Sequence, residues 1–142
     1  MVGASRELYP RDKLQTGPTI LVVEDEVLVR MMIDDELRNV GYTVLEASNA
    51  DEALEVLRHT PKVGLVFTDF RMPGSMDGAK FAVFVRSACP VLKIVLTSGE
   101  SAAVDLAEHD GFFPKPYDRA KVIQHIEALL ERGTPKQSQS LL

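Results

Sequence analysis

An apolar run that stops at a carboxylate constrains the fold of this chain most strongly. Residues 65–68 read LVFT, Asp69 follows, and a loop containing Pro73 and Gly74 comes next. A short apolar run closed by turn residues is typical of a buried strand. In an open parallel sheet, functional groups lie just beyond the carboxyl ends of the strands. Asp69 therefore occupies the position at which such a sheet carries its chemistry.

A second apolar run ends in the same way. Residues 20–23 read ILVV and are followed by Glu24, Asp25 and Glu26. If the two predicted strands are neighbours, about 4.8 Å apart, their terminal carboxylates converge at one edge of the sheet. Like charges that close repel one another unless a cation lies between them. Mg²⁺, which prefers oxygen ligands, is the cation that this arrangement predicts.

The whole sequence alternates between strand and helix patterns. This alternation predicts an α/β fold, namely a flavodoxin-like (βα)5 doubly wound parallel sheet with strand order 2-1-3-4-5. The domain is expected at residues 18–133, between a flexible arm at 1–17 and a disordered tail at 134–142. A shortened fourth helix is expected at 102–109. The predicted strands are residues 19–23, 43–47, 63–68, 93–97 and 111–114.

Helical spacing of apolar residues predicts which sides of the helices face the sheet. In the helix at 78–88, Phe81, Phe84 and Val85 are expected to point inward. The helix after the first strand is expected to bury a mostly apolar face consisting of Val27, Leu28, Met31, Met32, Asp35 and Leu37.

Composition limits the classes of function. The chain has 142 residues, enough for one domain, and its formal net charge of −5 argues against non-specific nucleic-acid binding. The single cysteine, Cys89, cannot form an internal disulfide, is expected to be at least half-buried, and fits a reducing, cytoplasmic location. No run approaches the roughly 20 apolar residues of a membrane span. His59, His109 and His125 lack ligand spacing and are expected at the surface.

The residues at the predicted strand ends suit phosphoryl chemistry. The Asp69 carboxylate can act as a nucleophile towards a phosphoryl group and form an acyl phosphate. Such a group needs its charge neutralised, and the Lys115 ammonium, a compact point charge, can do this together with Mg²⁺. The expected ligands of Mg²⁺ are Glu24, Asp25, Asp69 and the backbone carbonyl of Arg71. A hydroxyl from Ser98 or Thr97 can donate a hydrogen bond to another phosphoryl oxygen.

Five motifs stand in order, each at a predicted strand end or in the loop that follows it. They are Val23-Glu24-Asp25-Glu26, Thr68-Asp69-Phe70-Arg71-Met72-Pro73-Gly74, Met76-Asp77-Gly78, Leu96-Thr97-Ser98-Gly99 and Lys115-Pro116-Tyr117. In this pattern the chain from about residue 19 to 132 resembles the receiver domain of bacterial two-component response regulators, which is a CheY-like (βα)5 domain.

The resemblance implies a role for each matching residue. Asp69 is then the phosphoacceptor, and Glu24 and Asp25 bind Mg²⁺. Lys115 faces the phosphate, and a cis Lys115–Pro116 bond would aim its side chain inward. Ser98 takes the switch hydroxyl, with Thr97 as the second choice, and Phe112 is the aromatic switch. The implied phosphodonor is a phosphohistidine on a histidine kinase or a histidine phosphotransfer protein. An unidentified downstream protein would bind the switched form, and the receiver would be a monomer or a weak dimer.

The sequence departs from the family pattern in three places. The loop at 72–78 has one extra residue, the interval between Ser98 and Lys115 is short, and Phe112 replaces a tyrosine and therefore offers no phenolic hydrogen bond. The short interval puts the usual dimer mode of the family in doubt. We also hypothesise that Arg71 and Glu100 pair across the site and slow attack by water.

Other functions remain open at this stage. A Mg²⁺-dependent phosphohydrolase commonly carries a second aspartate two residues after the nucleophile, where this chain has Arg71. A flavodoxin-like cofactor binder would need a phosphate-cradling loop where Glu24, Asp25 and Glu26 would repel phosphate. The chain could also be a scaffold that works without phosphorylation, or a receiver excised from a hybrid histidine kinase. Structurally, Asp25 could be only a helix N-cap and Asp69 only a turn residue.

Overall fold

Five parallel strands form one sheet in the order β3-β2-β4-β5-β6, which confirms the predicted flavodoxin-like order 2-1-3-4-5. The structure is a computed structural model that describes residues 17–71, 76–99 and 109–132. Its strands are β2 (Thr19–Val23), β3 (Thr43–Ala47), β4 (Val63–Asp69), β5 (Lys93–Ser98) and β6 (Gly111–Pro114).

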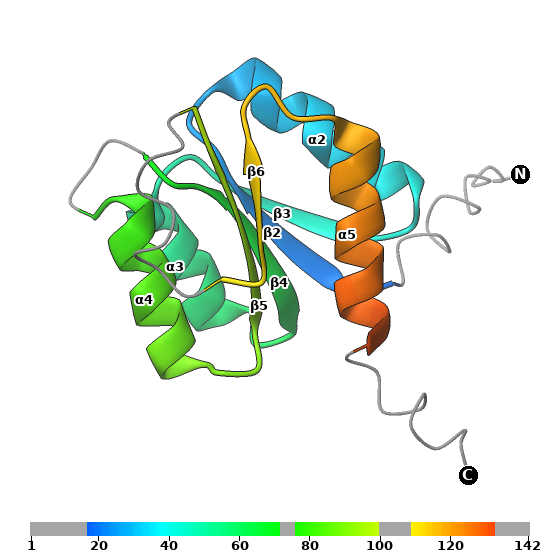
Figure 1. Cartoon of the computed structure of the whole chain (residues 1–142). Coiled ribbons are helices and arrows are strands. Elements are labelled where there is room, and N and C mark those ends of the chain that lie inside the picture. Colours follow the sequence, from blue (N-terminus) through cyan, green and yellow to red (C-terminus); the bar gives the residue numbers. More distant parts are fainter. Residues whose placement is uncertain (1–16, 72–75, 100–108, 133–142) are drawn as a thin grey trace, which may run out of the picture.

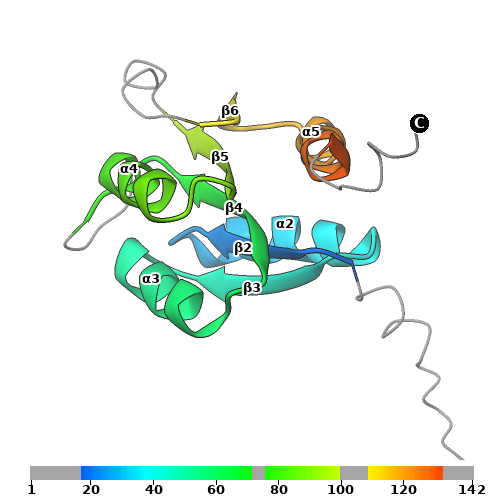
Figure 2. The ribbon, with the colours of Figure 1, turned by 90° about the horizontal axis from the view of Figure 1, so that it is seen from below.

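Helices cover both faces of the sheet. Figures 1 and 2 show α3 and α4 on one face and α2 and α5 on the other. The bounds are α2 (Val27–Asn39), α3 (Ala50–His59), α4 (Gly78–Ala88) and α5 (Arg119–Arg132). The short helix predicted at 102–109 falls in a segment that is almost wholly outside the described residues. The predicted arm and tail also lie there apart from Gly17, so the domain bounds stay predictions.

The central strands are buried on both faces, which explains why their sequences are continuously apolar. Successive side chains of β2 and β4 enter opposite layers. Leu21 and Val66 belong to the core beneath α3 and α4, which we call the α3/α4 core. Ile20 and Phe67 belong to the core beneath α2 and α5, which we call the α2/α5 core. A slip of one residue would exchange the two sets of side chains, so packing fixes the register of the strand ends.

Local sequence signals mark where the helices begin and end. Gly41 has a φ of 109°, a left-handed conformation that favours glycine, and it follows the last turn of α2. The Asn49 side chain accepts a hydrogen bond from the Glu52 backbone amide at 2.8 Å and caps α3. Asp77 caps α4 by accepting from the Lys80 amide at 2.9 Å. None of the helices in the described parts of the chain is both long and apolar enough to cross a bilayer.

The predicted inner face of α2 is wrong for all but one of its members. Only Leu37 is buried, and the helix turns Ile33 and Asp34 towards the sheet with it. The other members, Val27, Leu28, Met31, Met32 and Asp35, are exposed. Because α2 carries apolar residues on two sides, helical spacing alone does not decide which side is buried.

Several other surface assignments differ from expectation. Phe84 is half-exposed, whereas its neighbours Phe81 and Val85 are buried as predicted. Cys89 is exposed, because α4 ends beside it at the surface. Of the three histidines only His59 is fully at the surface. His125 is half-buried, with its ring Nε2 2.8 Å from the Asp110 carbonyl oxygen, and His109 is also half-buried.

Asp34 is a carboxyl group buried between α2 and β3. It is 1% exposed, and neither of its oxygens receives a hydrogen bond from a described donor. Burial raises the pKa of Asp34 to about 7, and the negative charge of Glu46 adds to this effect. Arg38 and Arg30 oppose it. A proton on Asp34 can be donated to Glu46, so the buried carboxyl is satisfied in its neutral form.

Replacing Asp34 with Asn should stabilise the protein at alkaline pH. The unfolded carboxyl titrates near its ordinary value of 3.8 and the folded one near 7, so stability falls as the pH rises between these values. At about pH 8 we expect Asp34→Asn to raise the free energy of unfolding by about 2 kcal/mol, and at about pH 4 to change it little. Urea denaturation at both pH values measures this.

The exposed neighbour Asp35 provides the control, since Asp35→Asn should leave the pH dependence unchanged. A wild-type stability at about pH 8 equal to that of Asp34→Asn would contradict the prediction.

Candidate functional site

The carboxyl ends of four strands meet at one edge of the sheet. The register pairs Val23 of β2 with Thr68 of β4, so Glu24 and Asp69 follow side by side. Asp69 in turn pairs with Thr97 of β5. Ser98 pairs with Pro114 of β6, and Lys115 follows that proline. The topology therefore brings together residues as distant in the sequence as Glu24 and Lys115. They meet at the carboxyl ends of the strands, where this class of fold carries its ligands.

Three carboxylates converge at this edge. Glu24, Asp25 and Asp69 each offer an oxygen, and these oxygens lie within 4.8 Å of one another. Glu24 is 4% and Asp69 6% exposed, whereas Asp25 is open to solvent. The Glu24 side chain also accepts a hydrogen bond from the Glu26 backbone amide at 3.0 Å, which orients it. The site has two buried carboxylates and one that an approaching molecule can reach.

Lys115 links the two buried carboxylates. Its Nζ lies 3.0 Å from Glu24 Oε1 and 3.0 Å from Asp69 Oδ2. Its backbone amide donates to the Ser98 carbonyl at 2.8 Å, which extends the pairing of β5 and β6 past the last strand residue. The Lys115–Pro116 peptide bond is cis, as expected. Tyr117 follows and packs edge-on against Phe67, with ring centroids 5.6 Å apart.

Burial and ion pairing have opposite effects on the pKa value of each of these three groups. Burial raises the pKa of Glu24 and of Asp69, and the hydrogen bonds and charge that Lys115 provides only partly offset it. Burial alone would lower the pKa of Lys115, but its hydrogen bonds to the two carboxylates outweigh burial and raise it. Lys115 is therefore a permanent cation, and it holds two carboxylates that retain protons more readily than free ones.

The donor set suits a hard cation. Three carboxylates face one ammonium group, so negative charge is in excess, and every candidate ligand is an oxygen. Carboxylate oxygens suit Mg²⁺, which commonly keeps waters on its open positions. The exposed side of Asp25 leaves room for such waters. Glu24, Asp25 and Asp69 therefore fit a bound Mg²⁺. The predicted role of the Arg71 carbonyl stays a prediction.

The strand register distinguishes between Thr97 and Ser98. Paired residues of parallel strands lie on the same face, as Phe67 and Val95 do in the α2/α5 core. Asp69 and Thr97 are the pair two residues further on, so they share that face, and Ser98 lies on the other. Both hydroxyls are buried. The register favours Thr97 as the hydroxyl beside Asp69, although the sequence resemblance ranked Ser98 first.

The loop after β4 passes close to the first turn of α4. A Cβ placed on Gly78 would collide with the Asp69 carbonyl oxygen, so only glycine allows this approach. The Arg71 amide contacts Asp69 Oδ1 at 3.4 Å, a long hydrogen bond, and the Arg71 side chain is exposed. Glu100, the partner hypothesised for Arg71, and residues 72–75 of the loop with the extra residue are outside the described parts of the chain.

The structure brings together most of the predicted site residues and adds one that the sequence did not single out. Phe112 packs, partly buried, against the α3/α4 core. The addition is Arg30, whose Nη1 donates to the Glu24 carbonyl at 2.7 Å. Nothing in the sequence pattern pointed to Arg30, because its other partner, Glu46, is an exposed residue of the outermost strand β3, where a charge is ordinary.

Comparison with known proteins agrees with this arrangement. The response regulator receiver domain is the family whose model matches, over residues 20–127. The fold and the convergent strand ends define a receiver domain, and the chain belongs to the response regulator receiver family of two-component systems.

Relatives carry the same domain in different settings. Sensor kinase CckA of Brucella abortus is 35% identical over 125 residues, which cover 84% of this chain and 13% of the kinase. The phosphate regulon transcriptional regulatory protein PhoB of Pseudomonas aeruginosa is 28% identical over 131 residues, which cover 87% of this chain and 56% of the regulator. The chain thus spans about half of such regulators and a small part of the kinase.

Solved structures share the fold over most of the chain. The receiver domain of NtrX from Brucella abortus has a TM-score of 0.71 and 29% identity, and the match covers 79% of this chain and 98% of that one. A response regulator receiver protein from Sinorhizobium medicae has a TM-score of 0.75 and 28% identity, with 82% of this chain and 96% of that one covered.

Binding of Mg²⁺ should become tighter as the pH rises. Because burial raises the pKa values of Glu24 and Asp69, the folded protein holds protons there that the ion must displace. We expect Mg²⁺ to raise the melting temperature, and its apparent affinity to be severalfold higher at about pH 8 than at about pH 5. Thermal unfolding during a Mg²⁺ titration measures both effects.

Asp25→Asn should remove most of this stabilisation, whereas Asp35→Asn, an exposed carboxyl on α2, should retain it. Equal Mg²⁺ affinity at the two pH values would contradict the proton linkage.

Proposed function

We propose that this protein is a phosphoacceptor response regulator, in which Asp69 accepts a phosphoryl group from a phosphohistidine. One observation carries the proposal: Asp69 is buried, paired with Lys115 at 3.0 Å, and clustered with two further carboxylates at the edge of the sheet. Nucleophile, fixed cation and candidate metal ligands are thus in one place. The family membership supports the same chemistry.

The residues divide the work of phosphoryl transfer. An Asp69 oxygen forms the new P–O bond while the P–N bond of the donor phosphohistidine breaks, and the imidazole leaves with the electron pair. Lys115 remains charged and neutralises a phosphoryl oxygen, and the Thr97 hydroxyl can donate to another, with Ser98 as the alternative. Bound Mg²⁺, held by Glu24, Asp25, Asp69 and the Arg71 carbonyl, would supply further charge neutralisation.

Phosphorylation would then change the surface around β5 and β6. The new group adds negative charge and acceptor oxygens beside Thr97, and this draws the hydroxyl towards Asp69. Phe112 pairs with Leu96 of β5 and lies half-buried, so it can respond by repacking. The downstream partner would read this change. Monomer or weak dimer, and a cytoplasmic location, belong to the same proposal.

Phosphorylation can be tested directly by intact mass. Incubation with acetyl phosphate or phosphoramidate and Mg²⁺ should add about 80 Da, the mass of one phosphoryl group on a carboxylate. The gain should vanish in Asp69→Asn and when EDTA removes Mg²⁺. Asp35→Asn, which replaces an exposed aspartate away from the site, should gain the same mass as wild type. Retention of the full gain by Asp69→Asn would contradict the assignment of the phosphoacceptor.

The exposed apolar side of α2 suits the phosphodonor protein. Leu28 is 73% exposed, and Val27 and Met31 are exposed beside it, only a few residues after Asp25. A hollow lined by Met32, Lys115 and Tyr117, among others, continues this surface towards the site. A protein that delivers a phosphoryl group to Asp69 must cover this region, and exposed apolar side chains favour contact with a protein partner. We therefore place the docking of the donor here.

Leu28→Glu should impair docking of the phosphodonor protein without changing the phosphorylation chemistry at Asp69. Phosphotransfer from a phosphorylated histidine kinase or phosphotransfer protein should slow by about tenfold or more, since burying a charge at an interface costs about 1.4 kcal/mol or more. Phosphorylation by acetyl phosphate should stay at the wild-type rate. Val91→Glu is the matched control, because Val91 is 82% exposed but lies just before β5, at the opposite edge of the sheet. Equal slowing by both substitutions would argue against this docking face.

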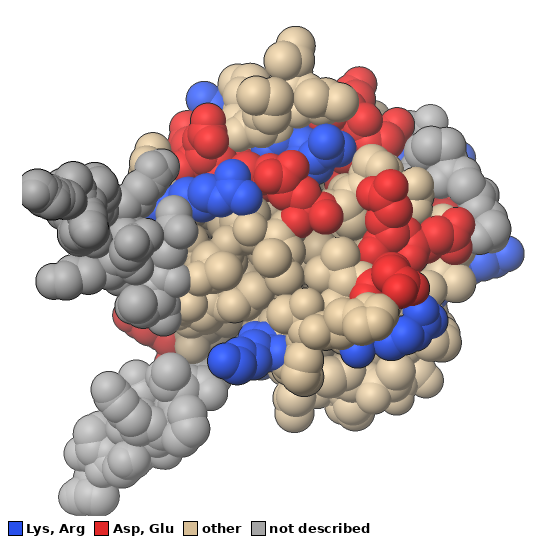
Figure 3. Space-filling model, turned by 180° about the vertical axis from the view of Figure 1, so that it is seen from behind, with Lys and Arg blue, Asp and Glu red and all other residues tan. Residues whose placement is uncertain are grey.

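The alternative functions are less well supported. A phosphohydrolase would need an acid where the exposed Arg71 stands. On the face drawn in Figure 3, acidic and basic side chains are interleaved, which does not favour nucleic-acid binding there. A phosphorylation-independent scaffold would show no mass gain with either small donors or a protein donor. The match to a sensor kinase keeps open a receiver that belongs to a hybrid kinase.

A further inference from the structure

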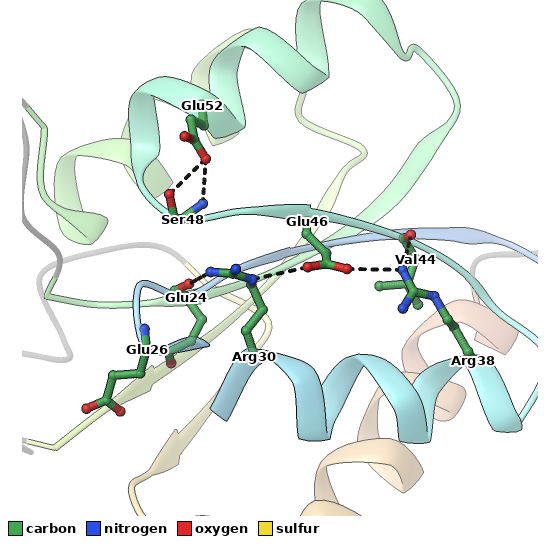
Figure 4. A network of polar contacts seen from close by, with 8 residues as sticks. All are labelled: Glu24, Glu26, Arg30, Arg38, Val44, Glu46, Ser48 and Glu52. Carbon is green, nitrogen blue, oxygen red and sulfur yellow. Dashed lines mark hydrogen bonds and ion pairs between the residues drawn. The ribbon is translucent and has the colours of Figure 1, made fainter. Parts of the chain in front are cut away.

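Arg30 links the loop that contains Glu24 and Asp25 to Glu46 on β3. Its Nη1 donates to the Glu24 carbonyl oxygen at 2.7 Å, and its Nε lies 3.2 Å from Glu46 Oε1. Figure 4 shows the side chain leaving α2 and lying between these two groups. The Arg30 side chain is 16% exposed and its contact with the Glu24 carbonyl is partly buried, whereas Glu46 is 38% exposed and its contact with Arg30 is open to solvent.

The loop that Arg30 holds has few other supports among the described residues. Glu26 takes the N-cap position of α2, and no side chain caps the helix there. The Glu24 amide donates to the Ala47 carbonyl at 3.0 Å, and the Glu24 carboxylate accepts from the Glu26 amide. Asp25, between them, is exposed. The guanidinium of Arg30 is thus the side-chain contact that fixes the carbonyl of Glu24, immediately before Asp25.

Glu46 anchors the other end of this link. It lies on β3, the outermost strand next to β2, and pairs in the register with Val22, two residues before Glu24. Its second oxygen lies 3.3 Å from Arg38 Nη2. Although burial acts to raise the pKa of Glu46, hydrogen bonds from Arg30, Asp34 and Arg38 outweigh it and lower the pKa. The anchor is therefore ionised and held between two guanidinium groups.

We propose that Arg30 is a positioning residue for the phosphoryl site, which ties the loop of Glu24 and Asp25 to Glu46 and so sets the spacing of the metal-binding carboxylates. The inference rests on the proposed function, because it assigns these carboxylates to Mg²⁺. A charge-assisted bond from a guanidinium is stronger than a neutral one, and its fork can serve two acceptors at once. Lysine, with one ammonium group, cannot span both in the same geometry.

The test is Mg²⁺ affinity, measured by calorimetry and by backbone amide shifts of residues 24–26, with no phosphodonor present. Arg30→Ala should weaken Mg²⁺ binding about tenfold, as expected for loss of a group that orients metal ligands. Arg30→Lys should fall between Arg30→Ala and wild type, because it can make only one of the two bonds. Glu46→Gln keeps an acceptor oxygen for Arg30 but loses the charge, so it should weaken Mg²⁺ binding less than Arg30→Ala does.

Arg38 provides the matched control. It lies on the same helix and shares Glu46, but its other bond is to the Val44 carbonyl at 3.0 Å, so it does not reach the site. Arg38→Ala should keep Mg²⁺ affinity within about twofold of wild type, and urea denaturation should show whether the two alanine variants lose similar stability.

Wild-type Mg²⁺ affinity in Arg30→Ala, or equal weakening in Arg38→Ala, would overturn the proposal. If Arg30→Ala does not fold, Arg30→Lys decides by the same criteria. Failure of the proposed function is distinguishable: wild type would then bind Mg²⁺ but gain no phosphoryl mass, and the order of affinities among the variants would still report on Arg30.

Discussion

The contact of the Lys115 ammonium with Glu24 and Asp69 is the interaction on which the rest of the site depends. Two carboxylates with less than a tenth of their surface exposed would repel one another and lose hydration without it. One ammonium cannot neutralise three carboxylates, and the remaining negative charge at this edge suits a divalent cation. The electrostatics of the site therefore agree with the proposed Mg²⁺ chemistry.

The buried sheet holds these charges in place. Strands β2 and β4 are packed on both faces, so neither can shift along its axis without moving side chains between two cores. Glu24 and Asp69 follow directly from these strands, and Lys115 follows β6 with its amide bonded to Ser98. Apolar packing in the interior thus determines the spacing of the charged groups at the strand ends. The stability of the core offsets the repulsion between these carboxylates.

Much of the fold could be predicted because its strands are continuously apolar and end in charged or turn residues. The strand order, the helix at residues 78–88 and the convergence of Glu24, Asp25, Asp69 and Lys115 follow from that pattern and from the family motifs. The inner face of α2 could not be predicted, since apolar residues lie on two sides of it. The choice between Thr97 and Ser98 depends on register across strands, and the Arg30 and Asp34 contacts join residues distant in the sequence.

Helix α2 shows why the misassigned residues matter. Its Ile33 and Leu37 enter the α2/α5 core, its Arg30 holds the Glu24 carbonyl, and its Leu28 and Met31 remain in solvent. Exposed apolar side chains contribute nothing to folding that polar ones would not, so their presence beside the site is better explained by contact with a partner. If the donor docks on α2 as proposed, it would contact the same helix whose Arg30 holds the Glu24 carbonyl. Docking on this helix would therefore take place beside the loop that carries the carboxylates.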